Sequence, residues 1–257
     1  METIVSRTLS VHKEHEFLLK LETAGFDDEL AQKVIGSKDN ELAVKVVRFI
    51  SNGGFEPTTN QKIAREIMGK NFFGVEEAIK HFGVNPSKQQ LLALSEIPFA
   101  EAILKECNDT HILIAIFPLS ILDVRGKVDS KLFCSHGDAW YNKQVFAKEK
   151  GEISWQLVKK TPVENSVSKT WNEQQALLSK DEEMPSARIV VYTTIGHFLV
   201  TNEWLFKNIY VRCSDLDSDG HRVYVGNFDS GRLYIDSVWD DYRDDNLGLA
   251  SSRKFQN

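Results

Sequence analysis

The sequence contains few cysteines, and this scarcity limits the classes of protein that it can encode. Only Cys107, Cys134 and Cys213 occur in 257 residues, and no two of them are close along the chain. Small secreted domains that depend on disulfides carry an even and dense set of cysteines. We therefore expect three reduced thiols, which are typical of a cytoplasmic protein.

Long hydrophobic runs are also missing. Residues 1–20 lack the apolar core of a signal peptide, so we predict none and expect a cytoplasmic location. The longest apolar stretch, 112–122, is interrupted by Pro118 and is too short to span a bilayer, which predicts no membrane insertion. Export with a partner, with display on a cell surface or a phage particle, stays open.

An excess of positive charge is absent as well. The formal net charge is −6, while the apolar and charged fractions are those of an ordinary globular protein. Nucleic-acid binders that rely on general electrostatics carry clusters of Lys and Arg, so we predict no nucleic-acid partner.

Sequence motifs of common enzymes are missing too. The chain has no G-x-x-x-x-G-K-[ST], G-x-G-x-x-G, H-E-x-x-H or G-x-S-x-G pattern. Cys134, His136 and Asp138 could form a zinc site, contain a Cys–His nucleophilic pair, or begin a turn before Trp140. His197 lies in an apolar segment, and it is either a buried core residue or a ligand. The lack of an assembled catalytic group favours binding over catalysis.

Hydrophobic spacing divides the chain into two regions, and together they predict an α+β fold. Residues 1–104 show helical periodicity, with short helices expected over 61–68, 75–82, 87–94 and 99–107. Residues 105–257 are rich in aromatics and turns, and they favour short antiparallel strands with two helices. Strands are expected over 111–117, 154–160, 209–212, 222–225, 233–235 and 247–251, and helices over 171–178 and 187–200.

Glutamate is absent from the last fifty residues, although nine aspartates occur there. The two side chains carry the same charge, so charge alone cannot explain the difference. Asp suits turns better than Glu because it can hydrogen-bond its own backbone. Five short polar residues lie between Trp239 and the apolar run 247–250, namely Asp240, Asp241, Asp244, Asp245 and Asn246. This segment reads as a binding surface.

The segment Asp215-Leu-Asp217-Ser-Asp219-Gly220 matches the beginning of a calcium loop. Alternating carboxylates can converge on one hard cation, with Asp229 as the distal ligand. A calcium loop of the EF-hand type has a bidentate Glu at its twelfth position, which is Gly226 here. The alternatives are therefore an acidic β-turn without a cofactor and a calcium site.

The C-terminal segments 222–229 and 239–253 resemble the end of the C-type-lectin-like fold, in the branch shared with formylglycine-generating enzymes. That branch ends with an R-V-x-x-G-x-[FW] strand, a polar loop and a strand reading (I/V/L)-G-(F/L)-x-x-x-R. The matching residues are Arg222, Val223, Gly226 and Phe228, followed by Leu247, Gly248, Leu249 and Arg253. The resemblance implies a lectin-like domain over 105–257. The catalytic member uses a cysteine pair in this region, and only Cys213 occurs here, so its activity is not implied.

The polar loop near the C-terminus also resembles the variable region of diversity-generating retroelement proteins. In that family adenines are randomised, and AAY codons become Asp, Tyr, Ser or His, or stay Asn, but cannot become Glu. The resemblance implies a ligand-binding protein, with a protein as the partner, whose variable surface is 227–246. The whole chain, notably 71–80 and 140–144, also resembles proteins of candidate-phylum bacteria, and that likeness implies no activity.

Two functions therefore stay open. The first is binding of a protein ligand through the variable surface, with the N-terminal helices as an assembly module. The second is an enzyme that uses Cys213 or the group Cys134, His136 and Asp138. We expect Trp239, Phe228, Leu247 and Leu249 to be buried framework and the polar set to be exposed. The expected ligand-binding residues are Asn227, Asp229, Ser230, Tyr234, Asp236, Ser237, Asp240, Asp241, Tyr242, Asp244, Asp245 and Asn246.

Overall fold

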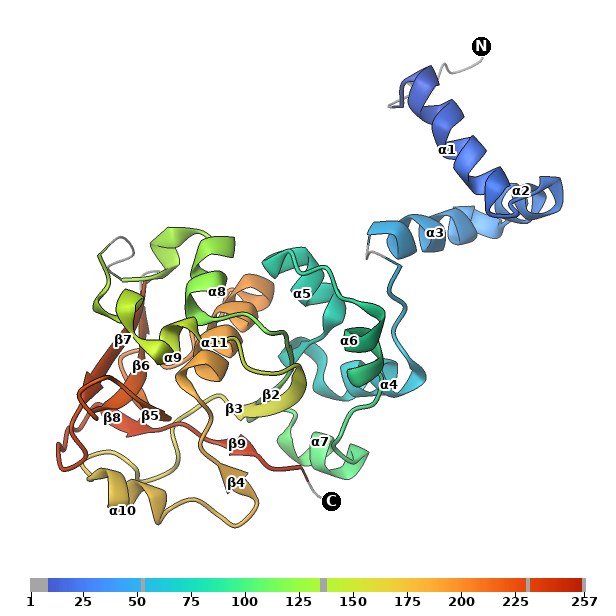
Figure 1. The fold of residues 1–257 in the computed structure, drawn as a ribbon. Coiled ribbons are helices and arrows are strands. Elements are labelled where there is room, and N and C mark those ends of the chain that lie inside the picture. The colour runs from blue at the N-terminus through green and yellow to red at the C-terminus, as the bar shows by residue number, and fades with distance from the viewer. Residues whose placement is uncertain (1–8, 52–53, 135–137, 230–231, 256–257) are drawn as a thin grey trace. The chain divides into compact units, whose positions relative to one another are not determined.

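The computed structural model describes residues 9–51, 54–134, 138–229 and 232–255 (Figure 1). Contacts between residues divide the chain into two compact units, Met1–Gly54 and Phe55–Asn257. Among the described residues, no helix is both long and apolar enough to cross a membrane.

The first unit consists of helices α1 (Val11–Thr23), α2 (Asp28–Ile35), η1 (Lys38–Asn40) and α3 (Glu41–Ser51). Ser10 and Asp27 cap α1 and α2 by accepting the N–H groups of Lys13 and Leu30. None of the side chains described in this unit is buried. Large apolar side chains are therefore exposed along these helices, among them Phe17, Leu18, Leu19, Leu30, Ile35, Val44, Val47, Phe49 and Ile50.

The second unit begins with helices α4 (Thr59–Met68), α5 (Val75–Phe82), α6 (Lys88–Ala93) and α7 (Glu101–Cys107). Between α4 and α5 lie η2 (Gly69–Asn71) and strand β1 (Phe72–Phe73), and β1 pairs parallel to β2. The Trp155 indole donates to the carbonyl of Leu94 at 3.0 Å, which joins α6 to the sheet. The unit boundary at Gly54 therefore replaces the boundary predicted at residue 104, because these helices share one core with the strands.

The first sheet has the order β1-β2-β3-β9-β4. Its long strands are β2 (His111–Ile116) and β3 (Ser154–Lys159). The short strand β9 (Ser252–Arg253) pairs with β3, and the edges of the sheet are β1 and β4 (Glu182–Glu183). Every residue of β2 is buried, as its continuous apolar run predicts. The expectations of strands over 111–117 and 154–160 are confirmed.

The second sheet has the order β7-β6-β5-β8, with β5 (Tyr210–Leu216), β6 (Arg222–Asp229), β7 (Arg232–Val238) and β8 (Leu247–Leu249). The pairs β5–β6 and β6–β7 are antiparallel, and β8 runs parallel to β5. The strands predicted over 209–212, 222–225 and 233–235 are confirmed. The strand predicted over 247–251 is instead divided, because the chain leaves the second sheet after Leu249 and enters the first at Ser252.

Helix α11 (Ala187–Thr201) contacts both β2 of the first sheet and β5 and β6 of the second, and it lies at the centre of the unit in Figure 1. It is buried over most of its surface, which explains why its sequence shows no polar face. The helix predicted over 187–200 is thus confirmed, whereas the one over 171–178 is only α10 (Trp171–Gln175). The 105–257 region also has helices that the sequence did not predict, namely α8 (Ile121–Lys127), η3 (Ser130–Leu132), η4 (Trp140–Lys143) and α9 (Val145–Lys148).

The fold is thus α+β, built from helices and two largely antiparallel sheets around one core. The side of the second sheet that faces α11 carries Val211, Val223 and Val225, all fully buried. Alternation along a strand places the neighbouring side chains on the opposite side, which positions the candidate site.

His111, the first residue of β2, provides a test of the packing between the sheet and its surroundings. Burial, with the nearby Lys159 charge, lowers the pKa of His111 to about 4. The unfolded chain takes up this proton near pH 6.5, so stability is complete above that pH and is lost as pH falls towards 4. We predict that wild type loses on the order of 2 kcal/mol more than His111→Gln between pH 7 and pH 5. Urea unfolding at both pH values measures this difference, and equal losses would contradict the burial of a neutral His111.

Candidate binding face

The outer side of the second sheet carries polar aromatic side chains on three adjacent strands. Tyr210 of β5, Gly226 of β6 and Tyr234 of β7 are partners in register, and Arg212, Tyr224 and Asp236 form the next row. The side chains of both rows lie on the side of the sheet away from α11. We call Tyr210, Tyr224, Tyr234 and Asp236 the outer face.

Gly226 allows the backbones of β5 and β6 to approach closely at this face. Its backbone has a φ of 152°, and a Cβ at this position would clash with the carbonyl oxygen of Ile209. Asn227 follows with a φ of 48°, and the β6–β7 register shifts between Gly226 and Asp229. Without a side chain at Gly226, the rings of Tyr210 and Tyr234 approach each other across it, with centroids 6.5 Å apart.

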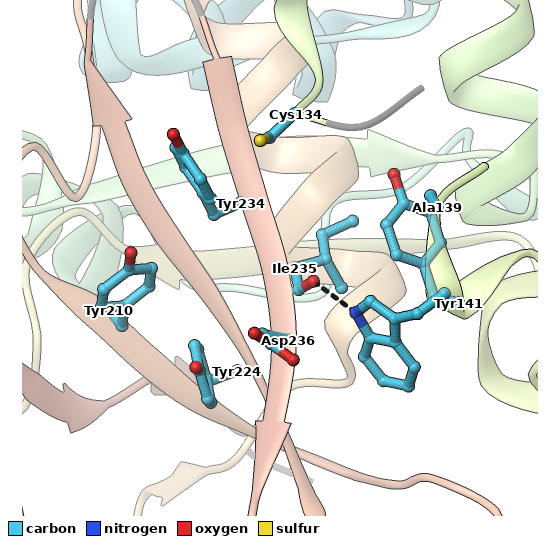
Figure 2. A pocket seen from close by; sticks show the side chains of 9 residues that line it. Cys134, Ala139, Tyr141, Tyr210, Tyr224, Tyr234, Ile235 and Asp236 are labelled. Carbon is cyan, nitrogen blue, oxygen red and sulfur yellow. Dashed lines mark hydrogen bonds between the residues drawn. The ribbon is translucent and has the colours of Figure 1, made fainter. Parts of the chain in front are cut away.

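A pocket of about 240 Å³ opens on the outer face, and we call it the tyrosine pocket. Figure 2 shows the outer-face side chains projecting from adjacent strands, with Cys134 beside Tyr234. Cys134 and Trp140 also line the pocket, and both are joined to β7: the Trp140 indole donates to the Ile235 carbonyl at 2.9 Å, and the Cys134 N–H donates to the Leu233 carbonyl at 3.0 Å. The described lining residues are Cys134, Ala139, Trp140, Tyr141, Tyr210, Tyr224, Tyr234, Ile235 and Asp236.

The three phenols of the outer face are held in their neutral form. Burial raises the pKa of Tyr224, and the Asp236 carboxylate raises it further. Burial also raises the pKa of Tyr210, and the hydrogen bond with the Cys134 thiol raises that of Tyr234. The pocket therefore offers neutral hydroxyls and aromatic faces, together with the carboxylate of Asp236.

Beside the pocket, a buried arginine holds the 239–246 loop in place. The Arg212 side chain is fully buried, and its guanidinium donates to the carbonyls of Lys169 at 3.1 Å, Trp239 at 3.5 Å and Tyr242 at 2.7 Å. It also donates to the Gln174 side-chain oxygen at 3.0 Å. Burial lowers the pKa of this guanidinium. The carbonyl oxygens of the loop and of the segment before α10 point at the guanidinium, and their partial negative charges stabilise its positive charge.

Gln174 extends this arrangement to β8. Its amide nitrogen donates to the carbonyls of Ser166 at 2.7 Å and Leu247 at 3.0 Å. The Ser166 hydroxyl in turn accepts the Leu249 N–H at 3.0 Å. A Cβ at Gly248 would meet Pro162 and Ser166 at less than 3 Å, so the close approach requires glycine. The framework beneath the loop is therefore a continuous hydrogen-bonded network.

The loop itself presents its side chains to solvent. The sequence prediction of a buried Trp239 is wrong, because this side chain is 56% exposed, with its ring near those of His221 and Tyr242. The framework uses the main chain of Trp239 rather than its ring. The expected burial of Phe228, Leu247 and Leu249 is confirmed.

None of the described residues expected to bind ligand is buried. Ser230 lies outside the described residues. The exposed members are Asp236, Asp240, Asp241, Tyr242, Asp245 and Asn246, and the half-buried members are Asn227, Asp229, Tyr234, Ser237 and Asp244.

The structure separates Asp215 from the other two aspartates of the expected calcium loop, Asp217 and Asp219. Asp215 accepts the Ala187 N–H at 2.5 Å at the start of α11, away from the turn. Asp217 accepts the N–H groups of Asp219 and His221 and the hydroxyl of Ser237. Asp217, Asp219 and His221 have ligand atoms within 4.8 Å of one another, so Asp215 does not join the cluster that the sequence predicted. The hydrogen bonds are those of an acidic β-turn.

The cysteine candidates have different surroundings. Cys213 is fully buried on the side of β5 that faces α11, and burial raises the pKa of its thiol well above the usual value. Reactive thiols are accessible and have a lowered pKa, so Cys213 lacks the environment of a nucleophile. Cys134 lines the pocket, whereas His136 lies outside the described residues. Asp138 is exposed.

His197 occupies the place expected of a core histidine. It is buried on α11, and its Nε2 lies 3.3 Å from a carboxylate oxygen of Glu203. Burial lowers the pKa of His197 despite this partner.

Sequence reasoning missed Tyr210, Tyr224, Trp140, Arg212 and Gln174 as parts of the site. Tyr210 and Tyr224 alternate with valines inside predicted strands, and this alternation is a signal that would have placed both rings on the outward side. No local pattern marks Arg212 or Gln174, because their partners are distant along the chain.

Comparison of the chain with protein-family models, with curated proteins and with solved structures finds no match.

Substitution of Arg212 tests the framework. A lysine cannot reach four acceptors in different directions, so we expect Arg212→Lys to lower the free energy of unfolding by about 3 kcal/mol. The N–H groups of Ser168 and Trp171, which donate to the loop carbonyls of Asp244 and Asp240, should exchange faster with solvent. Urea unfolding and amide hydrogen exchange measure the two effects.

The matched control is Arg232→Lys, at an exposed arginine of β7, which should change stability by less than about 0.5 kcal/mol. Equal effects of the two substitutions would show that Arg212 does not organise the loop.

Calcium provides a separate test of the acidic turn. We predict that millimolar calcium leaves the melting temperature unchanged, because Asp215 is engaged by α11 and Asp217 by the turn itself. Thermal unfolding with calcium and with a chelator measures this. A concentration-dependent increase that Asp219→Asn abolishes would instead establish a cation site.

Proposed function

We propose that this protein is a non-enzymatic ligand-binding protein that presents the tyrosine pocket and the 239–246 loop to a protein partner. The observation that carries the proposal is an exposed surface of aromatic and short polar side chains on a hydrogen-bonded framework. Tyr and Trp supply large contact area with few rotatable bonds, and short polar residues supply adaptable hydrogen bonds. A loop that is already ordered loses less entropy on binding.

We further propose that the surface 227–246 is a diversified region of the retroelement type on a C-type-lectin-like scaffold. The framework contacts the loop mainly through its main chain. The carbonyls of Trp239 and Tyr242 accept from Arg212, and those of Asp240 and Asp244 accept from N–H groups. Side chains at these positions can therefore change without removing the hydrogen bonds that hold the loop.

The absence of glutamate from this region supports the same proposal. Preference for turns accounts for aspartate in the loop and for Asp229 at the end of strand β6, but it does not account for Asp236, which lies within strand β7. Randomised AAY codons would place Asp, Asn, Ser and Tyr at such positions irrespective of local structure.

The first unit is proposed as the assembly module. Its helices are amphipathic and leave large apolar side chains exposed, such as Phe17, Ile35, Val47 and Phe49. Exposed apolar surface of this kind is typical of helices that pack against a partner. The proposal assigns ligand choice to the C-terminal surface and assembly to these helices.

The nucleotide sequence tests diversification directly. We expect the genome to contain, near this gene, a repeat of codons 227–246 that differs from the gene only at adenines of the repeat. A repeat with substitutions at other bases, or none near the gene, contradicts the diversification proposal.

Exchange of segment 227–246 between two alleles tests the binding function. Partner choice in a pull-down should follow the exchanged segment, and stability should change by only about 1 kcal/mol, because the framework is retained. Exchange of residues 9–51 serves as the control and should leave ligand choice unchanged. If partner choice follows residues 9–51 instead, the assignment of binding to the C-terminal surface is wrong.

A further inference from the structure

The tyrosine pocket has the arrangement of an aromatic cage. The rings of Tyr210 and Tyr224 have centroids 5.1 Å apart at 70°, and those of Tyr210 and Tyr234 are 6.5 Å apart at 89°. The ring of Tyr210 thus lies at a steep angle to the rings of both Tyr224 and Tyr234, and all three rings line the pocket together with Trp140. Electron-rich aromatic faces that surround a space attract a cation by their quadrupoles.

The described lining of the pocket carries a negative charge, which matches a cationic ligand. Among the described residues that line it, Asp236 is the only charged one. Asp229 also lies close enough for its charge to raise the pKa of Tyr210. Arg212 lies on the same side of the sheet, but its guanidinium donates to the carbonyls of the loop and to Gln174. A cation entering the pocket therefore meets the Asp236 carboxylate and the neutral phenols of the outer face.

The size of the pocket limits the ligand. A volume of about 240 Å³ is below the range of roughly 300–1,000 Å³ that is usual for sites enclosing whole small molecules. It suits the end of one long side chain better than a complete metabolite. Since the pocket opens beside an exposed binding surface, the rest of such a ligand would contact the 239–246 loop.

We propose that the tyrosine pocket binds a cationic side chain of the partner, the guanidinium of an arginine or the ammonium of a lysine. This inference rests on the proposed function, since it takes the partner to be a protein. Tyr210, Tyr224 and Trp140 lie outside the segment 227–246 and form a constant part of the cage. Tyr234 and Asp236 lie within that segment, so Asp236 sets the preference of this particular chain for a cation.

The indole N–H of Trp140 provides a direct reporter, because it donates to Ile235 in the wall of the pocket. The chain has five tryptophans, so each indole resonance can be followed separately by NMR. We expect blocked arginine and lysine peptides to shift the Trp140 resonance in a saturable way. Peptides with citrulline or acetyl-lysine have nearly the same shape without the charge, and they should bind at least tenfold more weakly.

Two substitutions that remove the same charge separate local recognition from general attraction. Asp236→Asn should weaken binding of the cationic peptides about tenfold, whereas Asp241→Asn, in the loop outside the pocket lining, should change it less than twofold. Tyr234→Leu should weaken binding several-fold without abolishing it. Both aspartates are exposed, so neither substitution should prevent folding.

Three results would overturn the proposal. These are the absence of a saturable shift, equal binding of the neutral peptides, and equal effects of the two aspartate substitutions. Tighter binding of tetramethylammonium than of the peptides would assign the pocket to a free small cation instead and would overturn the side-chain assignment. If the pocket binds no cation while partner choice still follows segment 227–246, this inference fails and the proposed function stands.

Discussion

The buried guanidinium of Arg212 is the interaction on which the candidate binding face depends. It joins three parts of the chain that are remote in sequence, namely β5, the segment before α10 and the 239–246 loop. No carboxylate takes part in these hydrogen bonds: the two terminal nitrogens donate to carbonyl oxygens and one amide oxygen, and the buried Nε has no hydrogen-bond partner. Removing a charged group from water is costly, so this arrangement is stable only while all of these acceptors are in place. The requirement couples the order of the loop to the folding of the sheet.

This coupling separates the roles of main chain and side chains in the loop. The carbonyls of Trp239 and Tyr242 point inward to Arg212, and their rings are left at the surface. A loop held through its carbonyls can carry many different side chains in the same conformation. The same separation explains why the largest side chain of the segment, Trp239, is exposed, although tryptophan is usually buried to a large extent.

The two sheets are joined by α11 and by the C-terminal segment, which is itself buried between β8 and β9. After β8 the Ala250 N–H donates to the Arg212 carbonyl, and one residue later the Ser251 carbonyl accepts from Lys159 of β3. The chain thus passes from one sheet to the other within a few residues. Because β8 both neighbours β5 and continues into β9, the binding face is anchored to the core of the whole second unit.

The sequence by itself determined the local elements of this protein. Alternation of aliphatic with polar or aromatic residues was sufficient to predict β5, β6 and β7, and the apolar runs predicted β2 and α11, because these signals arise from neighbours along the chain. The exposure of Asp240, Asp241 and Asp245 followed from the same local reasoning. The boundary at residue 104 was wrong because the two-residue strand β1 pairs with β2 and draws the preceding helices into one core.

Only the tertiary structure decided how these elements make a site. The register that aligns Tyr210, Gly226 and Tyr234 depends on a bulge and on pairing across three strands. The contacts of Arg212 and Gln174 depend on groups far away in the sequence. Asp215 lies apart from the acidic turn because its carboxylate accepts the Ala187 N–H at the start of α11. Trp239 is exposed because the loop turns its carbonyl, rather than its ring, towards the core. The burial of a side chain and its hydrogen-bond partners depend on parts of the chain that are distant in sequence. They cannot be predicted from the residues next to it in the sequence.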